Sequence, residues 1–281
     1  MNILITGASG FIGRNLIESL IKSNHSITAC INKSELSFDI KIYKTDFAQM
    51  LKITDWLPLL IGIDVVINCV GIIAENRKHS FDVIHHLAPL ALFKACEKTH
   101  VKRIIQISAL GADDSALVDY HKSKKKADDY LRQSLLEWFI LRPSLVYGEG
   151  GKSYRFFKHL SNLPIIPLIG DGQQLIQPIN IKHMVRVVEK CIVAKEANQA
   201  IDVVSEKTIT YQQWMMQLRS KKPKARFIKI PMKLMKFMAW LLRPLGLQLL
   251  SKDNLIMLEQ NNVGDYLPLK NFMGIKKGEE L

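Results

Sequence analysis

The sequence predicts an α/β protein with a doubly wound parallel sheet and a smaller, irregular α/β lobe in its second half. Three observations predict this fold class. Short apolar runs alternate with stretches of helical periodicity through the first 143 residues. A glycine-rich turn joins the first strand to the first helix, and residues 64–70 form a continuous β-branched run typical of a strand covered on both faces. Parallel strands need helical crossovers, so repeated alternation favours a parallel sheet.

The expected elements follow this alternation along the chain. Ser80–Thr99 contains Pro89, which either kinks the helix or marks its start. Strands are predicted at 2–6, 26–31, 40–43, 64–70, 101–108 and 138–141, and helices at 11–22, 80–99 and 120–135.

After Pro143, glycines and prolines interrupt the pattern. A helix is predicted at 182–194 and a strand at 201–204, and Thr210 with Gln213 indicates a capping box before a helix at 211–219. We therefore expect a main domain over residues 1–150 and a smaller lobe over 151–281, interleaved as one unit. The lobe should cover the carboxyl ends of the strands, where open α/β sheets bind ligands.

Composition limits the classes of protein. The 281 residues are 48% hydrophobic, which supplies a core, and the formal charge is +13. Nucleic acid, an anionic membrane, an anionic cofactor or a lysine-rich background would each explain the charge, but no nucleic-acid module or stacking platform is recognisable. Four scattered cysteines, the lack of a leader peptide and the lack of a long apolar stretch predict a cytoplasmic protein.

The glycine turn predicts a phosphate site. Gly7, Gly10 and Gly13 follow a strand and open a helix, in the run G-A-S-G-F-I-G. Glycines permit a tight turn and a close approach, and the helix that follows points free N–H groups at an anion. This context predicts that the turn binds the pyrophosphate of a nicotinamide dinucleotide.

The end of the second strand favours NADP(H) over NAD(H). A carboxylate there would hold the 2′-hydroxyl of NAD, but Asn32 and Lys33 occupy the segment. Lys33 could pair with a 2′-phosphate or belong to a solvated loop. Asp46, after the third strand, is a partner for the adenine amino group or a surface turn residue.

A tyrosine and a lysine lie four residues apart on the predicted helix 120–135. Tyr120 and Lys124 share one helix face, and a nearby cation is expected to lower the pKa of the phenol. Tyr120 could then exchange a proton with a substrate oxygen while Lys124 holds the nicotinamide ribose. Ser108, at a strand end, could donate to the same oxygen. The alternative is a solvated basic face, and no histidines or cysteines have metal-ligand spacing.

Together these residues resemble the short-chain dehydrogenase/reductase superfamily, in its extended or atypical branch. The resemblance implies a Rossmann-type sheet and Ser108, Tyr120 and Lys124 as catalytic residues. Three phrases, at 67–72, 107–113 and 140–148, look like the subgroup of the accessory subunit of respiratory complex I and its bacterial relatives. The cofactor contacts implied by the turn and by the matching segments are Gly7, Ser9, Gly10, Phe11, Ile12, Gly13, Asn32, Lys33, Asp46, Phe47, Cys69, Val70, Gly71, Tyr120, Lys124, Pro143 and Val146.

The sequence departs from the superfamily pattern at two places. His85 stands where a catalytic-helix asparagine is frequent, and Lys182 and His183 follow Q-P-I-N-I where relatives have acidic residues. A basic, methionine-rich segment at 232–250 is open to three interpretations: core packing, docking on a membrane surface or membrane complex at its inner face, or part of an apolar substrate pocket.

The leading hypothesis is an NAD(P)(H)-dependent oxidoreductase, or an epimerase/dehydratase-like protein, acting on an unidentified carbonyl or alcohol. The apolar segment suits a hydrophobic, quinone-like substrate. One alternative is a non-catalytic NADP(H)-bound accessory or assembly protein of a membrane respiratory complex. Another is a redox-sensing regulator that binds NAD(P) and a protein partner.

Overall fold

The structure, a computed structural model, describes residues 1–32, 35–220, 226–235 and 251–276. Seven strands, all parallel, form the main sheet of the described chain in the order β11-β6-β5-β4-β1-β2-β3. The predicted doubly wound fold is therefore confirmed. The strands are β1 (Asn2–Thr6), β2 (Ser26–Ile31), β3 (Lys41–Lys44), β4 (Val65–Asn68), β5 (Arg103–Ile107), β6 (Glu137–Pro143) and β11 (Gln199–Val203).

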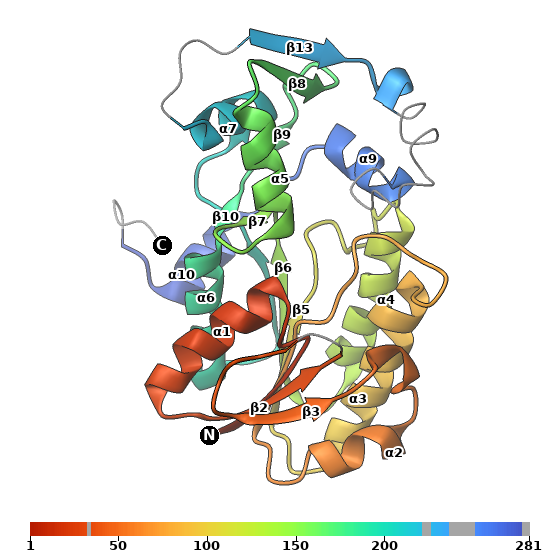
Figure 1. Cartoon of the computed structure of the whole chain (residues 1–281). Coiled ribbons are helices and arrows are strands. Elements are labelled where there is room, and N and C mark those ends of the chain that lie inside the picture. Colours follow the sequence, from red (N-terminus) through yellow and green to blue (C-terminus); the bar gives the residue numbers. More distant parts are fainter. Residues whose placement is uncertain (33–34, 221–225, 236–250, 277–281) are drawn as a thin grey trace.

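Helices cover both faces of this sheet (Figure 1). On β1, Ile3 and Ile5 enter one core while Leu4 enters the other, which explains the continuous apolar runs. One face packs against α1 (Phe11–Leu20), α6 (Ile181–Val193) and α10 (Tyr266–Met273), and the other against α2 (Ile53–Trp56), α3 (Ala88–Glu97) and α4 (Asp119–Gln133).

The second half builds a lobe at the top of Figure 1 and also returns to the main sheet through α6 and β11. The lobe has its own apolar core around Phe157, Tyr211 and Trp214. Among its described residues, paired strands are β7 (Val146–Tyr147) with β10 (Ile179–Asn180), β8 (Ile165–Ile169) with β13 (Arg226–Ile230), and β9 (Leu175–Ile176) with β12 (Ile209–Thr210). Its helices include α5 (Lys152–Ser161), α7 (Tyr211–Leu218) and α9 (Lys252–Glu259).

Local signals set several helix boundaries. The expected helix 80–99 is divided into a π-helical turn, η4 (Asp82–Leu87), and α3, whose first turn contains Pro89. The predicted capping box is confirmed, because Thr210 and Gln213 exchange side-chain and backbone hydrogen bonds of 3.1 and 2.8 Å. Short 3₁₀ turns are η1 (Ile21–Ser23), η2 (Phe47–Gln49) and η3 (Leu57–Leu59).

Two predicted features lie wholly or partly outside the described residues. Lys33 is one, and residues 236–250 of the basic segment 232–250 are the other. Within the described ranges, every helix is too short or too polar to cross a bilayer.

Candidate functional site

Three glycines form a turn that other residues could not form. Gly7 has φ +65°, and a Cβ there would lie 2.9 Å from the backbone of Cys69 and Val70. A Cβ on Gly13 would lie 2.6 Å from the carbonyl oxygen of Gly7, and one on Gly10 would lie 3.0 Å from the same oxygen. The turn is therefore packed backbone against backbone at the carboxyl ends of β1 and β4.

This turn presents the start of α1 as an anion site. Gly10 is the N-cap residue and has no side chain to accept from the first-turn N–H groups, and no acidic residue lies in that turn. The amides of Phe11, Ile12 and Gly13 therefore keep the positive end of the helix dipole for a ligand. Ser9 lies in the same turn. A dinucleotide pyrophosphate fits this cradle, because its charge and size match what the glycines leave open.

The ends of β2 and β3 form the side expected to hold adenosine. The Asn32 amide lies 3.4 Å from the Asp46 carboxylate, which also accepts from the Ala48 N–H at 3.2 Å. The ring of Phe47 turns into the core, 5.4 Å from the ring of Trp56, so only its backbone faces this edge.

Sequence reasoning missed Arg14 at this end of the site. Its exposed guanidinium donates to the carbonyl oxygens of Ser9 at 3.2 Å and Glu35 at 2.9 Å. It therefore joins the glycine turn to the chain that follows β2. The available signal was a basic residue directly after Gly13.

The segment after β4 forms the middle of the site. A Cβ on Gly71 would lie 3.5 Å from the Lys124 ammonium, so this part of the chain passes directly over the lysine. Cys69 is packed in the protein, which raises the pKa of its thiol to about 12. Pro143 ends β6, and Val146 lies on β7, so both predicted contacts also lie beyond the carboxyl edge of the sheet.

Tyr120 and Lys124 do lie together on α4, but their electrostatics differ from the expectation. The rings of Phe81, His85 and His121 surround the phenol with centroids 5.2–5.7 Å away. Burial raises the pKa of Tyr120 to about 12, so the expected lowering is wrong.

The charge of Lys124 does not overcome the effect of burial on the pKa of Tyr120. Its ammonium lies 5.9 Å from the centroid of the Tyr120 ring and donates to the Ile107 carbonyl at 3.0 Å. Burial also lowers the pKa of Lys124 to about 8, although the carboxylate of Asp128 opposes this shift. Burial thus disfavours the charged form of the lysine as well as that of the tyrosine.

Ser108 is bonded to another residue of α4. Its buried hydroxyl donates to Asp128 Oδ2, and the neighbouring Ala109 lines the cavity beside Tyr120. Burial raises the pKa of Asp128 to about 6, and its Oδ1 has no partner among the described residues.

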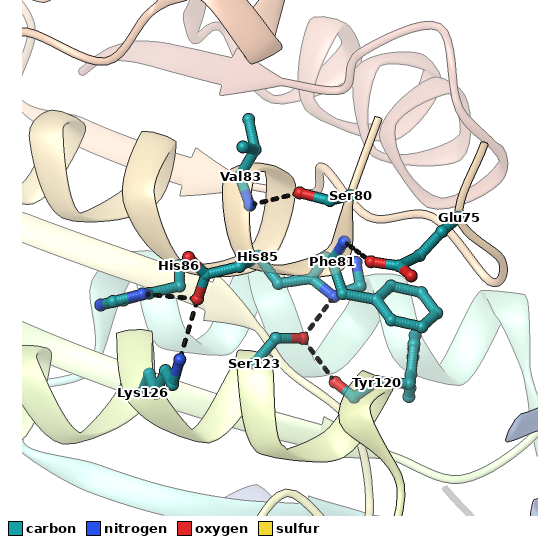
Figure 2. Close-up of polar contacts among 10 residues, drawn as sticks. Glu75, Ser80, Phe81, Val83, His85, His86, Tyr120, Ser123 and Lys126 are labelled. Carbon is teal, nitrogen blue, oxygen red and sulfur yellow. Dashed lines mark hydrogen bonds and ion pairs between the residues drawn. The ribbon is translucent and has the colours of Figure 1, made fainter. Parts of the chain in front are cut away.

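His85 ties the loop after β4 to α4 (Figure 2). Its Nε2 accepts from the Ile72 N–H at 3.0 Å, so the proton is on Nδ1, which donates to Ser123 Oγ at 2.9 Å. Ser123 in turn donates to the Tyr120 carbonyl at 2.9 Å. Burial lowers the pKa of His85 to about 2, so this residue stays neutral and positions the backbone.

A cavity of about 390 Å³ opens beside Tyr120 and extends into the second lobe. Of the predicted site residues, Tyr120 and Pro143 line it. Its walls are mainly aliphatic and aromatic, from Ile73, Leu110, Leu145, Phe156, Phe157, Leu160, Ile169, Ile176, Ile230, Met235, Met257 and Leu258. Across the described ranges, no group of three or more histidine, cysteine or acidic side chains is placed to hold a metal ion.

Comparison with known proteins agrees with this geometry. A family model described as NAD(P)H-binding matches residues 7–163. The mitochondrial NADH dehydrogenase [ubiquinone] 1 alpha subcomplex subunit 9 of Arabidopsis thaliana is 28% identical over 186 residues, which is 63% of this chain and 46% of the relative. The ceramide reductase of Caulobacter vibrioides is 23% identical over 179 residues, 62% of this chain and 55% of the relative. The chain thus spans about half the length of these relatives.

Solved structures share the fold. The UDP-glucose 4-epimerase of Thermotoga maritima, solved with UDP-glucose, superposes with a TM-score of 0.71 at 17% identity, over 99% of this chain and 94% of that chain. The UDP-glucuronic acid 4-epimerase of Bacillus cereus, solved with NAD, gives a TM-score of 0.65 at 21% identity, over 82% of this chain and 87% of that chain.

Substituting Gly7→Ala tests the packed turn. We expect it to lower the free energy of unfolding by at least about 2 kcal/mol more than Gly274→Ala, since both have positive φ but only Gly7 faces backbone at 2.9 Å. Urea unfolding measures the difference in stability between the two variants. NAD(P)H titration should show weaker binding for Gly7→Ala and unchanged binding for Gly274→Ala. Equal effects of the two variants would contradict the close contact.

The pKa of Asp128 predicts a pH dependence of stability. The native pKa of about 6 exceeds the ordinary value, so the native state binds more protons, and stability falls as pH rises from about 4 to 6. Asp128→Asn should remove this fall, measured as the urea midpoint at several pH values. Asp114→Asn, at a fully exposed carboxylate paired with Lys125, is the control and should keep the wild-type slope.

Proposed function

The chain belongs to the NAD(P)H-binding family of extended short-chain dehydrogenases, and we propose that it is an oxidoreductase that interconverts a carbonyl and an alcohol in the cavity beside Tyr120. The proposal rests on Tyr120, because it is the predicted catalytic residue that lines this cavity. Lys124 lies behind it, beneath Gly71 of the segment that follows β4. The proton donor thus lies between the cavity and the nucleotide edge.

The chemistry divides between the cofactor and the protein. When bound, the nicotinamide supplies or accepts the hydride. Tyr120, whose pKa of about 12 keeps it protonated at neutral pH, donates its proton to the carbonyl oxygen of the substrate. The ammonium of Lys124 stabilises the phenolate that forms, and its hydrogen bond to the Ile107 carbonyl holds it in place. Reduction is therefore the direction that the resting protonation state favours.

Ser108 is proposed as the second donor to the substrate oxygen. This role requires its hydroxyl to turn away from Asp128, with which it forms a hydrogen bond. Asp128 is then left with two buried oxygens to satisfy, which favours its protonation.

NADP(H) is the proposed cofactor. Asn32 places no carboxylate at the end of β2, and the exposed guanidinium of Arg14 bridges the turn to the chain after β2. A guanidinium is suited to a 2′-phosphate because it binds oxyanions with two parallel N–H groups. Lys33, the residue that the sequence singled out, would add a second cation.

A non-catalytic accessory role is the second candidate. The observation that favours it lies just beyond β5, where Ala109 lines the cavity and the Ser108 hydroxyl is already bound to Asp128. The plant relative is named as a subunit of NADH dehydrogenase. In this role NADP(H) would stabilise the fold, and residues 232–250 would dock on a membrane complex.

Substituting Tyr120→Phe separates the two candidates. We expect a 10²–10⁴-fold loss of kcat for NADPH oxidation with decanal, 2-dodecanone or a short-chain ubiquinone, with nucleotide affinity unchanged within about threefold. Tyr130→Phe removes a phenol that donates to Glu97 at 2.7 Å and should leave kcat unchanged. No turnover by the wild type with any of these compounds, together with one NADP(H) retained per chain, would support the accessory role.

Substituting Arg14→Ala tests the cofactor preference. Loss of one charge-assisted contact should weaken NADPH binding about tenfold and NADH binding less than twofold, measured by fluorescence titration. Lys22→Ala, at an exposed cation one turn beyond α1, is the control. Equal weakening of both nucleotides would place the guanidinium away from the 2′-phosphate.

A further inference from the structure

The far end of the cavity has a tyrosine hydroxyl that the proposed chemistry does not use. Tyr211 is the first residue of α7 and is 3% exposed. Its hydroxyl has no hydrogen-bond partner among the described residues. Buried polar groups are almost always paired, and because Tyr211 is one of the residues that line the cavity, a ligand can supply the missing partner.

A second residue of the cavity wall also has an unpaired polar atom. The Tyr211 N–H donates to the Gln174 carbonyl at 2.9 Å, so the two residues are backbone neighbours. Gln174 Nε2 donates to the carbonyls of Ile169 at 3.0 Å and Leu258 at 2.9 Å, which fixes the orientation of its amide. Its Oε1 is buried without a partner and belongs to a residue that lines the same cavity.

The walls around these two groups are uncharged. Among the described residues that line the cavity, none is aspartate, glutamate, lysine or arginine. His121 lies beside Tyr120, and burial lowers its pKa to about 4, so it adds no charge at neutral pH. A diphosphate placed here would lose its hydration without gaining a cation, which is costly.

We propose that the site binds an uncharged, mainly apolar substrate that carries a hydroxyl group at the end remote from the reacting carbonyl. Tyr211 donates to the oxygen of that hydroxyl, and Gln174 is a second residue of the same cavity wall with an unsatisfied polar atom. The carbonyl end faces Tyr120, and this assignment of the two ends rests on the proposed function. A sugar nucleotide, such as the UDP-glucose with which one structural neighbour was solved, does not match the uncharged walls that the described residues form.

The test uses the full chain saturated with NADP⁺, which cannot reduce a ketone, so that the heat reports binding alone. Isothermal titration compares 2-ketones of eight to fourteen carbons with their ω-hydroxy counterparts, and UDP-glucose serves as the charged probe. Each added methylene should tighten binding about two- to fourfold. At the chain length that reaches Tyr211, the ω-hydroxyl should tighten binding a further two- to tenfold, and UDP-glucose should show no heat.

Two conservative variants localise the effect. Tyr211→Phe should abolish the gain from the ω-hydroxyl and leave the affinity of the plain ketones within twofold. It should not lower the melting temperature, because the hydroxyl that it removes has no partner. Tyr130→Phe, outside the cavity, should retain the full gain.

The outcomes distinguish this inference from the proposed function. No gain from the ω-hydroxyl at any chain length, or tighter binding of UDP-glucose than of every ketone, overturns the inference. Binding of the hydroxy ketones as expected without NADPH oxidation supports the inference and overturns the proposed function. Tyr120→Phe should keep the gain from the ω-hydroxyl, measured against its own plain ketones, while losing turnover, which separates the two proposals.

Discussion

Contact between two backbone segments, at Gly7 and at Cys69–Val70, sets the position of every other part of the site. Because Gly7 has no side chain, the turn after β1 lies against the chain leaving β4. Gly13 then packs on the Gly7 carbonyl, which fixes the direction of α1 and of its free amides. Beneath this contact, Thr6 donates to Asn68 and Asn68 to Gln106, at 2.6 and 2.7 Å, so buried side chains hold the ends of β1, β4 and β5 level.

The two halves of the site differ in the charge that they accept. The glycine turn and Arg14 present positive potential to solvent, which suits a dinucleotide. Across the sheet edge, burial opposes charge of either sign: it raises the pKa of Tyr120 and Asp128 and lowers the pKa of Lys124 and His121. A polar cofactor and a neutral substrate can therefore meet at one edge, and the only charge required to form in the dry half is that of the reaction itself.

Local signals allowed much of this to be predicted from sequence. The sheet, the glycine turn and the Tyr120–Lys124 pair each depend on spacings of a few residues. The protonation of Tyr120 depends on Phe81 and His85, about 35 residues away, so the sequence suggested the opposite direction of shift. The partner of Ser108 and the unpaired state of Tyr211 likewise depend on packing between elements distant in the chain, which periodicity does not report.

Helix α4 connects these parts, because it bonds to η4, to β5 and to the chain just beyond β5. Ser123 bonds to His85 of η4, Lys124 to the Ile107 carbonyl of β5, and Asp128 to Ser108 just beyond β5. The position of the Tyr120 hydroxyl is therefore set by how the whole of α4 packs against η4 and β5, not by its own hydrogen bonds. Substitutions at these positions share partners and one rigid element, so their effects on stability and on the site should couple rather than add. A residue such as Ser123 can then alter the chemistry without contacting the substrate.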